Sequence, residues 1–159
     1  MLQIGTMAPD FELTDLDGES VSLSEMSGAP VVLNFFHTAC TWSRTMIPEL
    51  DAVYDRKDDI DIPILGIACG DDTVTTVREF ARENDINIFL GVDSDKSIRE
   101  DYAITRVPTV VFIDADGRIL STYEGASEQL PGIVEQALLA AARGDELPDF
   151  TLVGNGCAP

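Results

Sequence analysis

The chain has 159 residues, 45% of them hydrophobic, which is enough for one domain around a single core. Its 29 acidic and 10 basic residues give a net charge of −19, which argues against nucleic acid or an anionic membrane surface as a partner because both are bound through basic patches. The sequence also lacks an apolar run of membrane-spanning length and the basic start of a signal peptide, so no membrane insertion is expected.

Acidic residues are spread along the chain, whereas lysine occurs only at Lys57 and Lys96. This pattern predicts a solvated acidic shell of the kind expected in a salt-adapted protein; the alternative is an ordinary acidic protein. We expect a soluble chain of prokaryotic type. Its compartment is not named by the sequence and is cytoplasmic, or extracytoplasmic if a signal or anchor has been removed.

Strand patterns recur along the chain. An Asp-Gly turn at 17–18 joins two short strand-like runs into a predicted hairpin. Continuous apolar runs such as PVVLNFF are typical of strands that are buried on both faces. Strands are expected at residues 11–14, 20–23, 30–36, 62–68, 88–92, 108–114 and 118–125.

Helical patterns alternate with these strands. The first helix begins at Thr41 and has an apolar stripe at spacings of three and four. The second has an acidic start that suits the helix dipole, and the last ends at Gly144. Helices are expected from residue 41 onward and over 71–86, 96–102 and 128–144. The stripe of the first helix contains Met46, Ile47, Leu50, Val53 and Tyr54.

This alternation predicts an α/β fold with a mainly parallel central sheet, antiparallel edge strands and helices on both faces. The hairpin would be an N-terminal extension. Residues 118–125 are expected to pair antiparallel with the strand before them, because a short DADG turn connects the two. We expect one domain over 1–144, followed by a C-terminal tail over 145–159.

Three cysteines, Cys40, Cys69 and Cys157, are too few for a disulfide scaffold, and their spacing is not that of a zinc site. The single histidine, His37, rules out a site with several histidine ligands. We therefore expect neither a metal nor a cofactor.

Cys40 lies where a buried strand meets a helix. The unpaired amide groups and the dipole at a helix N-terminus stabilise a thiolate, which is the nucleophile in disulfide exchange. Arg44 can bring positive charge near this thiolate. The alternative is a buried structural cysteine.

Pro108 stands at the entry of a predicted strand, in the segment RVPTVVFID. This position suits a cis peptide bond. The backbone of Val107 would stay unpaired in such a loop and could bind an extended peptide by strand addition.

Three linked motifs cover residues 5 to about 143: G-x-x-APDFEL-x-D-x-DG-x-x-VSL, VVLNFF-x-T-x-C-x-x-S-R and Y-x-I-x-x-VPT-x-x-FID-x-DG-x-I. Together they resemble the thioredoxin-like superfamily, in particular the redoxin (AhpC/TSA) branch with its TlpA-like thiol:disulfide oxidoreductases. The resemblance implies a thioredoxin-like fold, with Cys40 as the attacking cysteine, Pro108 as the cis-proline and Val107 as a contact for the substrate backbone. It places Trp42 on the rim beside the sulfur; a packed aromatic residue is the alternative.

Three positions depart from this pattern. Asn34 stands where classical thioredoxins carry a buried aspartate, so that proton relay is missing. His37 replaces a small residue and is either a pH-dependent neighbour of Cys40 or an inert histidine. Ser43 occupies the position of the second cysteine, as a natural or an engineered serine. It can donate a hydrogen bond to the Cys40 thiolate, but it cannot release a mixed disulfide.

Two further cysteines are candidate partners of Cys40. Cys157 is a candidate resolving cysteine because its Gly-rich segment, VGNGCAP, could reach Cys40 or a second chain; the alternative, an incidental tail thiol, is favoured. Cys69 ends a buried strand and is assigned no role.

The sequence therefore predicts a thiol-disulfide oxidoreductase. Cys40 would attack the disulfide of a protein or of a small molecule, and an external thiol would resolve the mixed disulfide. One alternative is a peroxiredoxin-like thiol peroxidase, although Leu33 and His37 fail to match its P-x-x-x-T-x-x-C motif. Another is a redox-inactive module that binds extended peptides at Val107 and Pro108.

Overall fold

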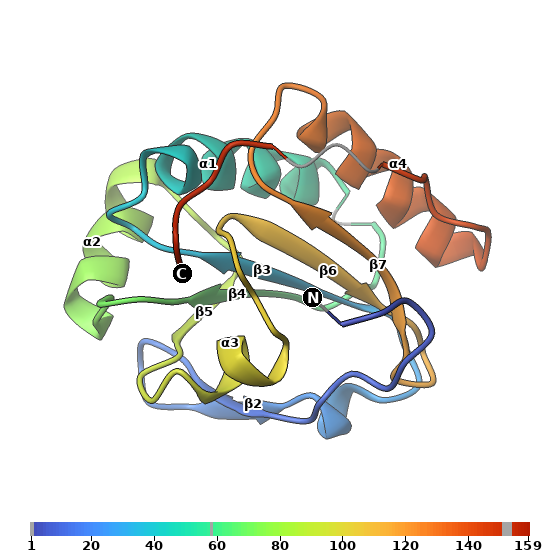
Figure 1. Cartoon of the computed structure of the whole chain (residues 1–159), viewed down its shortest axis with the longest axis horizontal. Helices are drawn as coiled ribbons and strands as arrows, with labels where there is room; N and C mark the ends of the chain where they lie inside the picture. Colours follow the sequence, from blue (N-terminus) through green and yellow to red (C-terminus); the bar gives the residue numbers. More distant parts are fainter. Residues whose placement is uncertain (1, 58, 151–153) are drawn as a thin grey trace.

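A five-stranded sheet forms the centre of the computed structural model, which describes residues 2–57, 59–150 and 154–159 (Figure 1). A separate antiparallel hairpin lies below it in this view, as predicted, and consists of β1 (Glu12–Thr14) and β2 (Ser20–Ser22). The central strands, in spatial order, are β5 (Phe89–Val92), β4 (Ile64–Ala68), β3 (Val31–Phe36), β6 (Thr109–Ile113) and β7 (Ile119–Glu124).

The central sheet is mixed. Strand β3 pairs parallel with β4, and β4 pairs parallel with β5. Strand β6 is antiparallel to both of its neighbours, β3 and β7, so the antiparallel pairing also reaches the middle of the sheet. The helix between β5 and β6, α3 (Ser97–Asp101), has only five residues. Such a short helix does not carry the chain back to the start of the sheet, so β6 begins at the end where β5 finishes.

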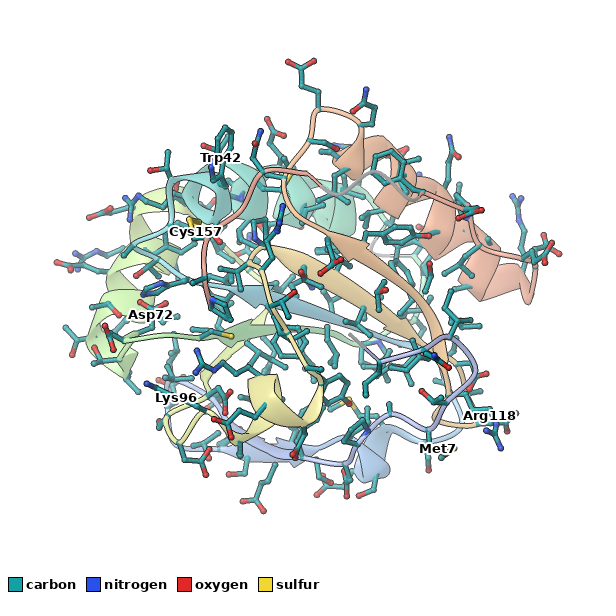
Figure 2. All side chains as sticks on the ribbon, viewed as in Figure 1. Met7, Trp42, Asp72, Lys96, Arg118 and Cys157 are labelled. Carbon is teal, nitrogen blue, oxygen red and sulfur yellow. A yellow bond between two sulfur atoms is a disulfide. The ribbon has the colours of Figure 1, made fainter. Side chains whose placement is uncertain are left out.

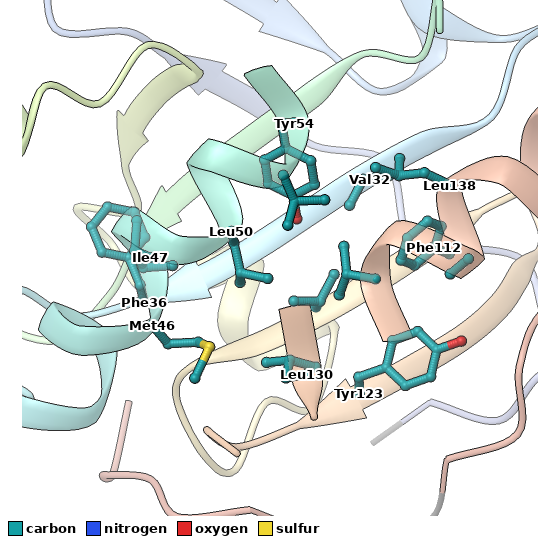
Figure 3. Close-up of a cluster of buried hydrophobic side chains, with 14 of the residues drawn as sticks. Val32, Phe36, Met46, Ile47, Leu50, Tyr54, Phe112, Tyr123, Leu130 and Leu138 are labelled. Carbon is teal, nitrogen blue, oxygen red and sulfur yellow. The ribbon is translucent and has the colours of Figure 1, made fainter. Parts of the chain in front are cut away.

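Alternate residues of β3 serve two hydrophobic cores, one on each face of the sheet. Val32 and Phe36 pack in a cluster with three helices, whereas Leu33 and Phe35 pack on the other face, against the hairpin and α3. Figure 3 shows part of the first cluster, including the predicted stripe residues Met46 and Leu50. The three helices are α1 (Thr41–Arg56), α2 (Val74–Asn84) and α4 (Leu130–Arg143).

The helix boundaries follow local signals in the sequence. Thr73 caps α2, because its side chain accepts from the Thr76 amide while the Thr76 side chain accepts from the Thr73 amide. Gly144 ends α4 in the left-handed conformation, with a φ of 73°. No helix within the described ranges has both the length and the apolar composition to cross a membrane.

The last residues return to the body of the protein. Figure 1 shows the C-terminal segment, coloured red, passing over α1 and ending near the carboxyl end of β3. Residues 154–159 contact the loop before β6 and the end of β7 through backbone hydrogen bonds. This part of the predicted tail therefore lies against the site described next.

Candidate active site

Cys40 occupies the N-cap position of α1, four residues after β3 ends at Phe36. Its amide donates to the His37 carbonyl at 3.0 Å, and its carbonyl accepts from the Arg44 amide at 2.9 Å. The side chain is 2% exposed. The buried strand β3 ends at Phe36, and after a short turn the chain begins α1, so that Cys40 lies at the junction of strand and helix.

The side chain of Cys40 forms a disulfide with Cys157, a residue 117 positions away in the sequence. The two Cα atoms are 6.0 Å apart. Figure 2 shows Cys157 beneath the start of α1. The expectation of an incidental tail thiol was therefore wrong, because a flexible glycine-rich segment gives no local sign of where it docks.

The tail binds as an extended strand, on the backbone atoms that the sequence analysis assigned to a peptide substrate. The Val107 amide donates to the Cys157 carbonyl, and the Cys157 amide donates to the Val107 carbonyl, each at 2.9 Å. Asn155 pairs in the same way with Ala126, at 2.6 and 3.0 Å. The peptide bond between Val107 and Pro108 is cis. The tail thus lies in a groove between the loop before β6 and the end of β7, and its backbone pairs with both walls.

Two arginines bind the backbone of the tail. The Arg106 guanidinium donates to the Gly154 carbonyl at 2.7 Å, and the Arg99 guanidinium donates to the backbone oxygen of Pro159. Neither arginine was among the residues predicted to line the site. For Arg106 a signal existed, because it directly precedes the Val107 backbone that was expected to bind a peptide.

Ser43 and His37 lie beside Cys40. Ser43 is fully buried, and its hydroxyl oxygen accepts from the His37 amide at 3.3 Å. This hydrogen bond ties the turn after β3 to the first turn of α1 in the structure with the Cys40–Cys157 disulfide. The imidazole of His37 packs on Gly70, where a Cβ would lie 2.9 Å from the ring.

Arg44 was expected to bring charge to the thiolate, but its guanidinium contacts other groups. It donates to the Thr38 carbonyl at 3.0 Å, lies 3.8 Å from the Glu83 carboxylate and sits 5.6 Å from the centre of the Phe80 ring. These contacts tie the start of α1 to α2. A single carboxylate, Asp72, adds a second tie by accepting from the Thr38 amide at 2.8 Å.

Trp42 lies on the rim of the site and is 42% exposed. With Thr105, Arg106 and residues 155–158 of the tail it lines an open hollow of about 300 Å³. Figure 2 shows the indole above Cys157. Its place agrees with the rim position that the resemblance implied.

Asn34 forms a buried polar pair with Tyr54. The Tyr54 hydroxyl donates to the Asn34 side-chain oxygen at 2.6 Å, and the Asn34 amide donates to the Leu65 carbonyl at 3.3 Å. Burial raises the pKa of the Tyr54 phenol. An ionisable relay is thus replaced by a neutral hydrogen-bonded pair.

Cys69 is the free cysteine and is 1% exposed. Burial raises the pKa of its thiol to about 12, with further contributions from the nearby carboxylates of Asp93 and Asp72. A thiol with this pKa is a poor nucleophile at neutral pH. Within the described part of the chain, no three His, Cys, Asp or Glu side chains are grouped as a metal site would require.

The mixed sheet, the cysteine at the start of α1 and the cis-proline loop opposite it define a thioredoxin-like protein. The profile of the AhpC/TSA family matches residues 4–122. The chain belongs to this family.

Known proteins support the same class. The thiol-disulfide oxidoreductase ResA of Bacillus cereus (strain ZK / E33L) is 29% identical over 137 residues, which are 85% of this chain and 79% of that protein. The thioredoxin domain of a thiol-disulfide oxidoreductase from Bacteroides vulgatus has a TM-score of 0.73 and 26% identity, covering 85% of this chain and 97% of that one. An uncharacterised conserved protein from Geobacillus kaustophilus shares the fold, with a TM-score of 0.88 and 20% identity over 99% of this chain and 92% of its own.

Proposed function

We propose that this protein is a thiol-disulfide oxidoreductase in which Cys40 attacks the substrate and Cys157 resolves the mixed disulfide. The observation that carries the proposal is the disulfide between these residues, formed across paired backbone strands. The similarity to proteins named thiol-disulfide oxidoreductases supports the reaction class.

The reaction begins with the reduced protein. The Cys40 thiolate attacks one sulfur of a substrate disulfide, that disulfide bond breaks, and the other substrate sulfur leaves with the electron pair. The Cys157 thiolate then attacks the Cys40 sulfur. The second substrate thiolate leaves, and the Cys40–Cys157 disulfide remains. The substrate has gained two electrons and, once its thiolates take protons from water, is released as a dithiol.

An external thiol has a different task in this scheme from the one expected from the sequence. It does not release the substrate; it reduces the Cys40–Cys157 disulfide to start another cycle. Ser43 has no thiol with which to release the mixed disulfide, and Cys157 can perform this step because it can reach the Cys40 sulfur. Substrates of the proposed reaction are protein disulfides whose backbone can pair with Val107, or small-molecule disulfides.

Three variants, each with one cysteine replaced by serine, test the proposal. The reduced protein is mixed with oxidised insulin, quenched with acid and resolved by mass spectrometry without reductant. We expect wild type to yield the Cys40–Cys157 disulfide, and Cys157→Ser to accumulate a mixed disulfide on Cys40. Cys40→Ser should form neither. The matched control, Cys69→Ser, should behave like wild type.

A Cys157→Ser variant that turns over substrate like wild type would refute the resolving role. If Cys40→Ser still reduces insulin, the attacking cysteine has been assigned wrongly. Peroxide consumption, measured on the same preparations, separates disulfide exchange from a peroxidase: wild type should reduce insulin and leave peroxide nearly untouched.

A further inference from the structure

The docked tail shows the backbone path that a bound substrate segment would follow in the groove. It presents a cysteine to Cys40 from an extended segment whose backbone is paired at Cys157 and again at Asn155. A substrate that reacts at the same sulfur must place its own cysteine where Cys157 lies. The residues before that cysteine then follow the path of Gly154 to Gly156.

Two positions on this path have no room for a side chain. A Cβ on Gly156, the residue directly before the cysteine, would lie 2.6 Å from the Val107 carbonyl oxygen and 2.7 Å from Arg106 Cδ. A Cβ on Gly154, the third residue before the cysteine, would lie 2.9 Å from the Ala126 nitrogen and closer still to its carbonyl. The obstacles include backbone atoms of the paired segments, which cannot rotate away.

The requirement at both positions is one of space, and Gly156 has no positive φ that would itself favour glycine. The groove itself is shaped for the same close approach. A Cβ on Gly125, at the end of β7, would lie 2.8 Å from Gly154 Cα and closer to its carbonyl. The position between the two tail glycines differs, since Asn155 is exposed and its side chain meets solvent.

We propose that the protein acts on an extended segment of a redox partner whose reactive cysteine is preceded by the pattern Gly-x-Gly, with x free to vary. The pattern is set by Arg106 and Val107, which leave no room for a side chain on the residue directly before the cysteine, and by Ala126, which leaves none on the third residue before it. This inference rests on the proposed function and specifies its substrate class. In the oxidised protein the tail fills the same groove, so the partner competes with the protein's own Gly154–Cys157 segment.

Activated peptides test the pattern directly. Each carries a cysteine joined by a disulfide to thionitrobenzoate and is mixed with the reduced full-length Cys157→Ser variant. The Cys40 thiolate bonds to the peptide sulfur, the peptide–thionitrobenzoate bond breaks, and coloured thionitrobenzoate leaves with the electron pair. The peptides are Gly-Asn-Gly-Cys-Ala and its three alanine replacements, at the first, second and third residues before the cysteine.

We expect alanine at the first or third position before the cysteine to slow the release about tenfold or more, the fold-change that corresponds to overpacking a fitted contact. Alanine at the second position is the matched control and should leave the rate unchanged. Residual docking of the variant's own tail would slow all four peptides equally, so the ratios are preserved.

Equal rates for the four peptides would overturn the proposal. Dithiobis-nitrobenzoate, which has no peptide backbone, serves as the reference for Cys40 chemistry. If it reacts while the peptides do not differ, only the substrate pattern fails. If it does not react with Cys40, the proposed function fails as well.

The tail itself supplies a second measurement. In the otherwise wild-type chain, Gly154→Ala and Gly156→Ala should weaken tail docking, and Asn155→Ala should not. The readout is the ratio of oxidised to reduced dithiothreitol at which half the Cys40–Cys157 disulfide is formed. A shift of about tenfold is expected for each glycine variant. Glycine variants that match Asn155→Ala would contradict the close fit.

Discussion

The backbones of Val107 and Cys157 exchange two hydrogen bonds of 2.9 Å, one in each direction, while the Cys157 side chain is bonded to Cys40. Cys157 is thus held twice, by a β-bridge to Val107 and by a disulfide to Cys40 at the start of α1. Docking and disulfide formation support each other, because a paired backbone holds the Cys157 sulfur at Cys40. Under the proposed mechanism, this coupling would let a cysteine in a glycine-rich segment act in place of a second cysteine in α1.

Cys40 and Cys69 should differ strongly in reactivity. In the reduced protein, the N-terminus of α1 favours the Cys40 thiolate and should hold the pKa of that thiol below the free value of about 8.5. Burial keeps the Cys69 thiol protonated, with a pKa of about 12. Site-resolved mass spectrometry of iodoacetamide labelling, across a pH series, measures both. Faster labelling at Cys69, or a Cys40 profile like that of a free thiol, would contradict this assignment.

A second cysteine in α1 should matter only when Cys157 is absent. In a Cys157→Ser chain, Ser43→Cys restores an intramolecular route for releasing the mixed disulfide, so insulin reduction with dithiothreitol should rise about tenfold or more. In the wild-type chain the same substitution should change the rate little. The control is Ser43→Ala in both chains, which adds no sulfur. A large gain from Ser43→Cys in the wild-type chain would show that Cys157 does not perform the release step.

Stability at alkaline pH should depend on Cys69. The folded protein holds the thiol proton up to about pH 12, whereas the unfolded chain loses it near the free value of about 8.5. Between these values the folded state binds more protons, so the free energy of unfolding falls as pH rises. One such group contributes a slope of up to about 1.4 kcal/mol per pH unit.

Urea unfolding of wild type and Cys69→Ala between about pH 8 and pH 10.5 checks this slope. The variant should be less stable at pH 8, because the smaller side chain leaves unfilled space, but its stability should fall less steeply with pH. The buried tyrosines are present in both proteins and cancel in the difference. Parallel pH profiles would mean that Cys69 titrates alike in the folded and unfolded chains.

Added salt should stabilise the fold. With a net charge of −19, repulsion between carboxylates opposes the compact state, and salt screens it over a Debye length of about 10 Å at 0.1 M. Thermal melts in KCl from about 0.05 to about 2 M, at constant pH, measure the effect. A rise that continues toward molar salt exceeds screening and would indicate a salt-adapted surface. A melting temperature that is flat or falls throughout the series would remove that interpretation.

Local patterns in the sequence were enough to predict most of the fold and the position of Cys40 at the start of the first helix. The buried run of β3, the apolar stripe of α1 and the stop of α4 at Gly144 depend on neighbouring residues, and the structure has all three. The place of Cys40 at the start of α1 follows from the same signals. Strand and helix periods, caps and turns act over a few residues, which is why they can be read from the chain itself.

Tertiary structure alone decided how distant groups meet. The orientation of Arg44 toward Glu83 and Phe80 depends on how α1 packs against α2. The disulfide joins Cys40 to a residue 117 positions away, because backbone pairing with Val107 and Ala126 brings the tail to that place. A flexible segment of small residues has no periodicity of its own, so its position is determined by the surface that it contacts.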